Sequence, residues 1–296
     1  RSGRVTGVQT CALPILILYM GGKNGLKKNL KDIEKQLTRL SCFAVAFSGG
    51  VDSSFLLAVA KKVNPEKLLA ITVSSQFVPE REIDFAKKIA RSIGVEHICL
   101  DMDILEKKDV VLNTKERCYF CKKQIFSLIK KAAESSGIKT LVHGVNLDDL
   151  SDFRPGLKAS EELGVLSPLA DAGFTKSDIR RLSKQLGLEN WDKPSQSCLA
   201  TRIPYNEKIK AGTLVMVDRA EAFLQNLGFD QVRVRCHGKT ARIEFEPDLV
   251  ETINKDIRQK ISTAFVKFGF EHTSIDIDGY KRSEERRVGK ECRSRW

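Results

Sequence analysis

A short stretch of glycine and serine has the residue types and spacing of an anion site. The apolar run 44–47 predicts a buried strand, which breaks at Ser48-Gly49-Gly50, and apolar residues at helical spacing resume after Ser54. Two glycines allow the backbone to approach a ligand closely, and the first turn of a helix presents N–H groups with partial positive charge. With the nearby serine hydroxyls as further donors, the stretch indicates a phosphate site.

Cysteines form a second chemical group. Cys118 and Cys121 lie in the first turn of an expected helix, and Cys198 lies in a loop of serines and a proline. Two thiols three positions apart can share one metal or redox centre, and we expect the helix N-terminus and the adjacent basic side chains to lower their pKa. The second Cys-x-x-Cys pair that zinc ribbons need does not occur. By themselves these cysteines also fit core residues or a thioredoxin-type couple.

Basic side chains are the third group. Val232 and Val234 alternate with Arg233 and Arg235, so both arginines are expected on one face of a strand. Such a pair suits a phosphate, and a solvated sheet edge is the alternative. Two further candidates to neutralise phosphate charge are Lys122 and Arg202.

Strands and helices alternate around these residues. After the lead-in helix 24–40, we expect strands at 44–47, 68–73, 97–100 and 140–143, with helices after Ser54, at 79–93 and after Cys118. This order predicts an α/β fold, a parallel sheet with helices on both faces. Ligands of such sheets bind at the carboxyl ends of the strands, which is where Ser48, Ser74 and Gly144 fall.

The chain length favours two domains. We predict a nucleotide domain at 24–200 and a smaller α+β domain at 201–281, with helices 213–227 and 248–268 and strands 231–236, 240–245 and 274–277. The ends, 1–23 and 282–296, resemble translated adapter read-through, so we expect them to be non-native flanks.

Composition fits a globular protein, with 42% hydrophobic residues. The formal charge of +12 favours anionic partners such as nucleotides or RNA. The apolar run 11–20 is too short to span a membrane, so we expect no membrane association. Cysteines without a credible export signal indicate a reducing compartment, and we expect a cytoplasmic protein.

The residues from Ser48 to Ser53 resemble the PP-loop, Ser-Gly-Gly-x-Asp-Ser, of the ATP pyrophosphatase superfamily. Together with the three cysteines, the chain from about 27 to 280 resembles the LarE family of ATP-dependent sulfur transferases. The resemblance implies a fold of the adenine nucleotide alpha hydrolase type, with adenylation of both carboxylates of pyridinium-3,5-biscarboxylic acid mononucleotide, release of pyrophosphate and formation of thiocarboxylates for the nickel-pincer cofactor. It implies ATP binding by Ser48, Gly49, Gly50, Val51, Asp52, Ser53, Ser54, Ser74 and Gly144.

The resemblance also implies cofactors and partners. Asp52 would assist Mg²⁺, while Lys122, Arg202, Arg233 and Arg235 would bind the mononucleotide substrate. A homo-oligomer is expected, with contacts from the C-terminal domain, and nucleic acid is not an expected partner.

The sulfur source separates two branches of the family. In one branch the cysteine that matches Cys198 gives up its own sulfur. Because Cys118, Cys121 and Cys198 are all present here, we favour a 4Fe–4S cluster on three thiolates with one open iron, and sacrificial use of Cys198 is the alternative.

Other functions remain open at this point. Some tRNA thiolases combine a PP-loop with three cluster cysteines, but their loop usually has lysine where this chain has Val51, and no RNA-binding module is evident. An ammonia-dependent amidating synthetase gives the cysteines no role. A non-catalytic nucleotide-binding regulator would keep the loop and the basic charge.

Overall fold

The first four strands form one parallel sheet. The computed structural model describes residues 24–150 and 155–280, so the expected flanks at 1–23 and 282–296 lie outside the described residues. The strand order is β3-β2-β1-β4, and all three pairings are parallel. The strands are β1 (Cys42–Ala46), β2 (Lys67–Ser74), β3 (Glu96–Asp101) and β4 (Thr140–His143). The predicted parallel α/β sheet is confirmed.

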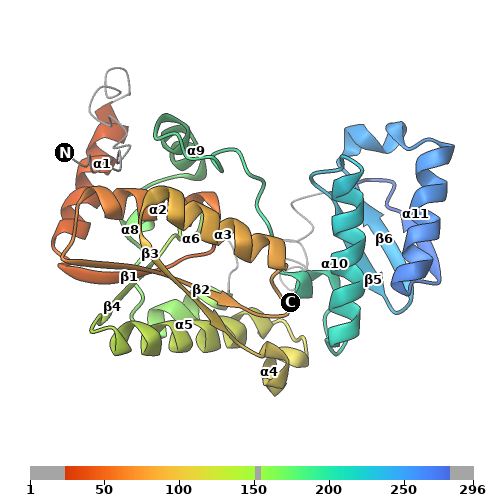
Figure 1. Cartoon of the computed structure of the whole chain (residues 1–296), viewed down its shortest axis with the longest axis horizontal. Helices are drawn as coiled ribbons and strands as arrows, with labels where there is room; N and C mark the ends of the chain where they lie inside the picture. Colours follow the sequence, from red (N-terminus) through yellow and green to blue (C-terminus); the bar gives the residue numbers. More distant parts are fainter. Residues whose placement is uncertain (1–23, 151–154, 281–296) are drawn as a thin grey trace, which may run out of the picture.

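Helices cover both faces of this sheet (Figure 1). Helices α2 (Val51–Lys62) and α3 (Glu80–Ile93) lie on one face, and α5 (Arg117–Ser135) lies on the other. Phe55 and Leu56 of α2 are fully buried in the first core, while Phe126 of α5 packs in a second core against β1 and β2. A central parallel strand is therefore apolar on both sides, which explains the uninterrupted hydrophobic run in β1.

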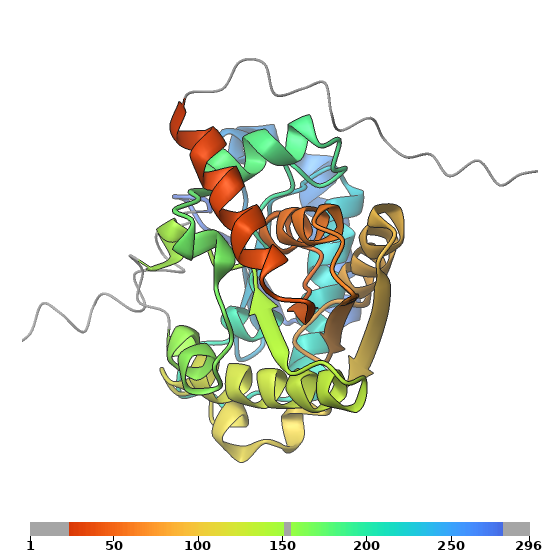
Figure 2. The same cartoon turned by 90° about the vertical axis from the view of Figure 1, so that its left-hand side faces the viewer.

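Further helices surround the sheet. They are α1 (Asn24–Thr38), α4 (Lys108–Val111), α6 (Leu147–Leu150), α7 (Pro155–Glu162), α8 (Pro168–Asp171) and α9 (Lys176–Gln185), with 3₁₀ turns η1 (Ile104–Glu106) and η2 (Leu199–Arg202). Figure 2 shows α1 and α5 on opposite sides of the strands. Helix α9 begins at a capping box, in which Thr175 accepts from the backbone N–H of Asp178 and the Asp178 carboxylate accepts in return. No helix within the described ranges is long and apolar enough to cross a membrane.

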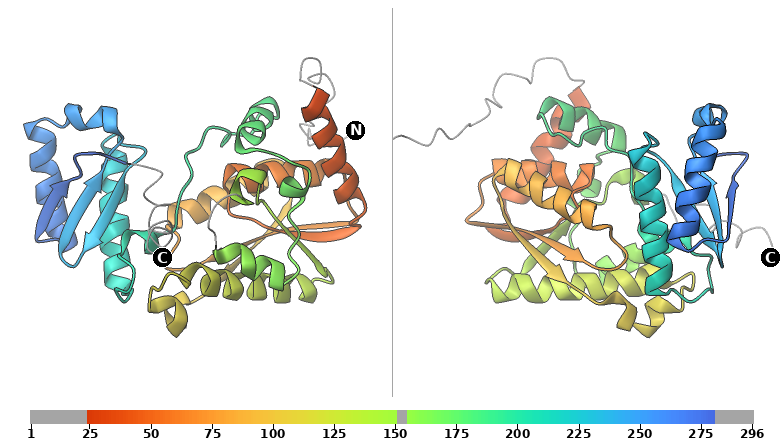
Figure 3. Two further views of the ribbon diagram at one scale, coloured as in Figure 1. Left: turned by 180° about the vertical axis from the view of Figure 1, so that it is seen from behind. Right: turned by 45° about the vertical axis from the view of Figure 1, so that its right-hand side comes forward.

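A second, smaller sheet lies toward the C-terminus, beside the first one (Figures 1 and 3). Its order is β5-β6-β7, antiparallel between β5 and β6 and parallel between β6 and β7. Its elements are α10 (Ala211–Asn226), β5 (Arg233–His237), β6 (Thr240–Glu244), η3 (Pro247–Thr252), α11 (Lys255–Phe268) and β7 (His272–Ile275). The predicted smaller α+β part of the chain is thus present.

One expected helix, 248–268, is wrong in its first part. The chain forms the 3₁₀ turn η3 and only then α11, because Asn254 caps the second helix. Its side-chain oxygen accepts from the backbone N–H of Ile257 at 2.9 Å. An asparagine that caps a new helix ends the preceding turn, since its own backbone is extended.

The core beneath the small sheet also contains residues from the first part of the chain. Phe77, Ile104 and Val110 pack in the same apolar cluster as Val234 and Phe245 of the C-terminal part. The two parts of the molecule are therefore joined by shared apolar packing rather than by a bare linker.

A buried ion pair stabilises the C-terminal part of the chain. The side chains of Arg202 and Glu221 are 1% and 3% exposed, and their bidentate contact measures 2.8 Å from Nε to Oε1 and 3.0 Å from Nη2 to Oε2. Arg202→Met leaves the Glu221 carboxylate buried without its cation, so we expect the free energy of unfolding to fall by about 3–5 kcal/mol. Urea unfolding measures the change.

The control is Arg81→Met, which breaks the partly exposed ion pair between Arg81 and Asp218. Exposed pairs contribute about 0–1 kcal/mol. An equally small loss for Arg202→Met would contradict the stabilising role of the buried pair.

Candidate functional site

The glycine and serine stretch lies where the strand order of the sheet reverses. From β1 the chain continues to β2 on one side, and β4 returns on the other side, so the carboxyl ends of β1 and β4 flank a crevice. Residues 48–54, here called the nucleotide loop, follow β1, and Gly144 follows β4. A Cβ on Gly144 would lie 2.8 Å from the backbone nitrogen of Ser53. The structure therefore brings these predicted residues together, and only glycine fits at 144.

The nucleotide loop presents backbone donors at the start of α2. Gly50 is the N-cap of α2 and no side chain caps the helix from there, so the first N–H groups keep the partial positive charge of a helix N-terminus. Ser48 and Ser53 are linked through their hydroxyls at 3.1 Å, and the Ser53 hydroxyl donates to the carbonyl of Gly50. This arrangement suits a phosphate group, and binding of ATP by these residues stays a prediction.

Gly49 is the position in the loop where a side chain is tolerated least. Its φ is +70°, and a Cβ would lie 2.9 Å from Cα and Cβ of Ala86 on α3. We expect Gly49→Ala to weaken ATP binding at least about tenfold, because the loop must shift away from α3 to relieve the contact. Isothermal titration calorimetry measures the affinity.

Gly94→Ala is the matched control, because Gly94 has φ +75° but no atom lies within 4 Å of the position that a Cβ would take there. Both variants carry the left-handed strain of about 1–2 kcal/mol. Equal loss of ATP affinity in the two variants would contradict the role of the contact with Ala86.

Asp52 faces a lysine that the sequence pattern does not single out. Lys176 Nζ donates to Oδ2 of Asp52 at 2.5 Å, and the lysine backbone N–H donates to Asp148 at 2.8 Å. Burial raises the pKa of Asp52, while Lys176 opposes the shift and Asp149 adds to it. Thr175 and Asp178 form the capping box of α9 and predict a helix that starts at Lys176. Nothing in the sequence predicts that this lysine contacts Asp52, which is 124 positions away.

Asn190 is a second residue that the sequence does not single out, although it joins the nucleotide loop to the cysteine loop. This side chain is 1% exposed, and its Nδ2 donates to the carbonyl of Gly49 and to Oγ of Ser54, both at 2.9 Å. Residues 190–198, here called the Cys198 segment, therefore begin at the nucleotide loop and end at Cys198.

The three cysteines share one neighbourhood. Cys118 and Cys121 lie in the first two turns of α5, and Cys198 directly precedes η2. The pKa of Cys121 is raised to about 12, mainly by burial and then by the charge of Cys198. Burial also raises the pKa of Cys198, against the opposing charge of Arg117. The expected lowering of the thiol pKa is therefore wrong for Cys121, since desolvation exceeds the effect of the nearby cations.

The described residues contain no group of three or more histidine, cysteine or acidic side chains arranged to hold a metal ion. Arg117 instead lies among the thiols. It is 2% exposed, and it donates to the carbonyl of Ala200 at 3.0 Å and to Sγ of Cys118 at 3.9 Å. This arginine thereby ties the start of α5 to η2 and keeps Cys118 close to Cys198.

The predicted basic residues lie in different surroundings. Lys122 is exposed and sits over the ring of Phe126, whereas Arg233 is fully buried and donates to the carbonyl of Ser195 at 3.0 Å. Arg235 pairs with Glu244 at 2.9 Å and donates to the carbonyl of Thr201. A solvated sheet edge does not describe this strand, because Arg233 has no exposed surface. Their binding of a substrate phosphate stays a prediction.

Comparison with known proteins decides the family. Residues 30–133 match the asparagine synthase family. The pyridinium-3,5-bisthiocarboxylic acid mononucleotide synthase of Lactiplantibacillus plantarum is 31% identical over 253 residues, which are 85% of this chain and 89% of that protein. This chain belongs to the LarE family. It is an ATP-dependent sulfur transferase of the PP-loop type.

Two uncharacterised relatives extend the LarE family match. A protein of Synechocystis is 37% identical over 265 residues, covering 89% of this chain and 98% of that protein. A protein of Methanocaldococcus jannaschii is 32% identical over 256 residues, covering 86% of this chain and 96% of that protein.

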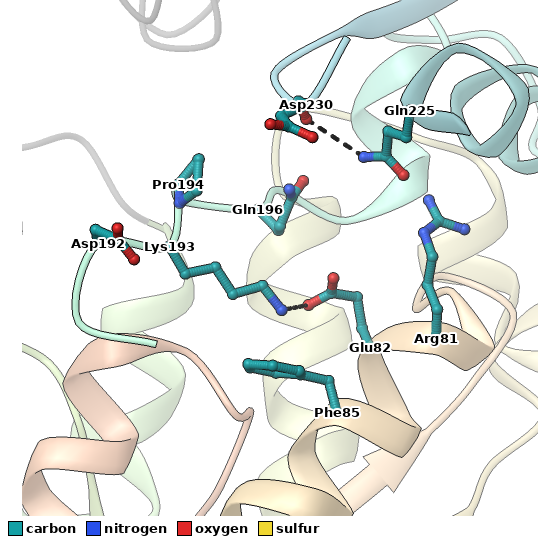
Figure 4. A pocket seen from close by; sticks show the side chains of 9 residues that line it. All are labelled: Arg81, Glu82, Phe85, Asp192, Lys193, Pro194, Gln196, Gln225 and Asp230. Atoms are coloured by element: carbon teal, nitrogen blue, oxygen red, sulfur yellow. Dashed lines mark hydrogen bonds and ion pairs between the residues drawn. The ribbon is translucent and has the colours of Figure 1, made fainter. Parts of the chain in front are cut away.

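Two cavities flank helix α3 of this LarE family chain. One cavity, of about 350 Å³, is lined by residues that include Ser74 and Asp101, at the ends of β2 and β3. The other, of about 440 Å³, lies between α3, the Cys198 segment and α10 (Figure 4). In the second, Lys193 reaches across to Glu82 at 2.8 Å, and its Nζ lies 3.7 Å from the ring centre of Phe85. The Cys198 segment is thus fixed to α3 as well as to the nucleotide loop.

Proposed function

We propose that this chain adenylates the carboxylates of pyridinium-3,5-biscarboxylic acid mononucleotide with ATP and converts them to thiocarboxylates, for biosynthesis of the nickel-pincer cofactor. The observation that carries the proposal is the hydrogen bond from Asn190 to Gly49, because it joins the nucleotide loop to the segment that leads to Cys198. Carboxylate activation and sulfur delivery then belong to one crevice. The relative whose name states the bisthiocarboxylic product supports the choice of substrate.

The chemistry explains why ATP and a thiol are both needed. A substrate carboxylate oxygen attacks the α-phosphorus of ATP, the bond to the bridging oxygen of pyrophosphate breaks, and an acyl adenylate forms. The carboxylate, a poor electrophile, thereby acquires AMP as a leaving group. A sulfur nucleophile then adds to the acyl carbon, and AMP departs with the electron pair of the carbon–oxygen bond.

The nucleotide loop supports the adenylation step. The uncapped N–H groups at the start of α2 and the hydroxyls of Ser48 and Ser53 would hold phosphate oxygens. Lys176 stands beside Asp52 and supplies the cation that this loop lacks in its own sequence. Electrostatic stabilisation of this kind is a major part of phosphoryl transfer catalysis.

Asp52 fits a magnesium ion. Its Oδ1 is buried and has no hydrogen-bond partner among the described residues, so one carboxylate oxygen is available to a cation. Magnesium is usually held by one or two carboxylates together with substrate phosphates, and Asp149 is near enough to affect the pKa of Asp52. The ion would neutralise phosphate charge when bound.

Sulfur delivery has two routes, and we favour a 4Fe–4S cluster on Cys118, Cys121 and Cys198. The donor chemistry suits a cluster, but the thiols are not arranged as a ready metal site among the described residues. In the alternative route the Cys198 thiolate attacks the adenylate to form a thioester. Loss of the Cys198 α-proton then breaks the Cβ–S bond and leaves dehydroalanine with the product thiocarboxylate. Iron and sulfide analysis after anaerobic reconstitution separates the routes, since only the first requires bound iron.

Basic residues around the Cys198 segment support a nearby substrate site. Arg233 and Arg235 donate to carbonyls of Ser195 and Thr201, on either side of Cys198. We propose that these arginines, with Arg202 and Lys122, form the substrate site. Lys122 is exposed and contacts the substrate phosphate directly, whereas Arg202, Arg233 and Arg235 hold the backbone around Cys198 and supply positive charge from behind it.

We propose domains at 24–200 and 201–281, and a homo-oligomer that covers apolar side chains of the C-terminal part, where Val266 is 62% and Ile277 is 93% exposed. Six free cysteines among the described residues agree with a reducing compartment, which we propose to be the cytoplasm.

Pyrophosphate release with a panel of acceptors tests the function. We expect release from ATP and Mg²⁺ only when the pyridinium biscarboxylate mononucleotide is present. Salt-sensitive release that depends on tRNA would support a tRNA thiolase instead. Release that depends on ammonia would support an amidating synthetase, and no release with any acceptor would support a non-catalytic regulator.

A further inference from the structure

Asn190 forms a hydrogen bond with the peptide group between Gly49 and Gly50, the peptide group of the nucleotide loop that can rotate most easily. Its amide donates to the carbonyl of Gly49, in the peptide unit between the two glycines. A Gly-Gly peptide can reorient at low energy because neither residue has a side chain. Since C=O and N–H of one planar peptide point in opposite directions, fixing the Gly49 carbonyl also fixes the Gly50 N–H, which lies 3.4 Å from Oγ of Ser48.

The same side chain begins the Cys198 segment, which is held along its length. Arg180 of α9 donates to the carbonyl of Lys193 at 3.1 Å, and the Lys193 side chain pairs with Glu82 (Figure 4). The pair is only about one-fifth exposed on each side. The middle of the segment therefore rests on α9 and α3, the helix that also contacts Gly49.

The far end of the segment is fixed to the C-terminal part of the chain. Arg233 donates to the carbonyl of Ser195, and Arg202 donates to the carbonyls of Ser197 at 3.2 Å and Cys198 at 3.3 Å. The backbone N–H of Leu199 donates to the carbonyl of Phe77 at 2.9 Å. Contacts thus hold the segment at Asn190, at Lys193 and again from Ser195 to Leu199, so a shift of Asn190 alters the path of the backbone that leads to the thiol.

We propose that Asn190 is a positioning residue that couples the conformation of the nucleotide loop to the position of Cys198. The inference rests on the proposed function, since it assigns the Gly49 contact a purpose in sulfur transfer. When the loop holds ATP in place, Asn190 keeps the thiol where the acyl adenylate forms. Without this contact the adenylate forms away from the thiol, and water attacks its acyl carbon to regenerate carboxylate and release AMP.

The ratio of pyrophosphate released to thiocarboxylate formed tests this coupling. We expect a ratio near one for the unaltered chain and at least a fivefold higher ratio for Asn190→Ala. Lys193→Met removes the side-chain contact with Glu82, keeps the contact of Arg180 with the backbone carbonyl and does not touch the nucleotide loop, so it should raise the ratio by a smaller factor. A merely structural role would lower both products together, so a wild-type ratio in both variants would overturn the inference.

The control is Asn254→Ala, which removes the cap of α11 and destabilises the chain far from the nucleotide loop. It should leave the ratio unchanged. If it raised the ratio as much as Asn190→Ala does, general destabilisation would be the cause and the inference would fail.

Amide hydrogen exchange provides a readout that does not depend on sulfur transfer. We expect ATP with Mg²⁺ to slow exchange in residues 194–199 of the unaltered chain and to have much less effect there in Asn190→Ala. Equal protection in both proteins would overturn the coupling. Should the unaltered chain form no thiocarboxylate at all, the proposed function would fail, and this exchange measurement would still decide whether Asn190 couples the two regions.

Discussion

Cys198→Ala is expected to reduce thiocarboxylate formation below detection while pyrophosphate release from ATP continues. Both sulfur routes require this thiol, either as a cluster ligand or as the sulfur itself, whereas adenylation depends on the nucleotide loop. In the sacrificial route, where Cys198 is the nucleophile, its loss should lower kcat for thiocarboxylate formation on the order of a millionfold. The measurement is the mass of the pyridinium product together with an enzymatic assay of pyrophosphate.

Cys42→Ala is the matched control. Cys42 begins β1, at the end of the strand opposite to the nucleotide loop, and its thiol lies 3.8 Å from Glu66. Its replacement should leave both products unchanged. Thiocarboxylate formation by Cys198→Ala at even a tenth of the wild-type rate would contradict the role assigned to this thiol.

Asp52→Asn is expected to lower kcat/KM for ATP by about 100- to 1,000-fold in pyrophosphate release, a range typical for loss of one group that stabilises developing charge. The substitution removes the carboxylate that is available to magnesium and leaves Lys176 without its partner, which is 2.5 Å away. Steady-state kinetics at several magnesium concentrations measures the loss. We expect the magnesium concentration for half-maximal rate to rise as well.

Asp171→Asn serves as the control, because Asp171 ends α8 and is exposed. It should keep wild-type kinetics. A wild-type magnesium dependence in Asp52→Asn would contradict the assignment of Asp52 to the metal, whatever its effect on the rate.

The sequence predicted those parts of the site that are local in the chain. Residues 46–54 contain a strand end, two glycines and a helix start in close succession, so their geometry follows from neighbouring residues. The order of strands and helices then predicted that Gly144 would meet this loop, because the carboxyl ends of parallel strands share one edge.

Contacts between distant segments could not be predicted in the same way. Lys176 meets Asp52 across 124 positions, and Asn190 meets Gly49 across 141. A lysine at a helix start and an asparagine before a loop have many ordinary explanations, and only the packed fold selects these partners. The prediction of a lowered thiol pKa was wrong for a related reason. Burial of Cys121 raises its pKa, and burial depends on the whole fold and not on the basic residues beside the cysteine in the sequence.

The central claim is that this chain places sulfur on the carboxylates of the pyridinium mononucleotide at the expense of ATP. Mass spectrometry of small molecules and of the intact protein, after turnover with ATP, Mg²⁺ and this substrate, tests it most directly. We predict a product in which one sulfur replaces one oxygen of each carboxylate, and one AMP is released for each replacement. A protein mass lowered by the elements of H₂S would assign the sulfur to Cys198, and an unchanged mass would favour the cluster. Unmodified substrate alongside AMP and pyrophosphate would contradict the claim.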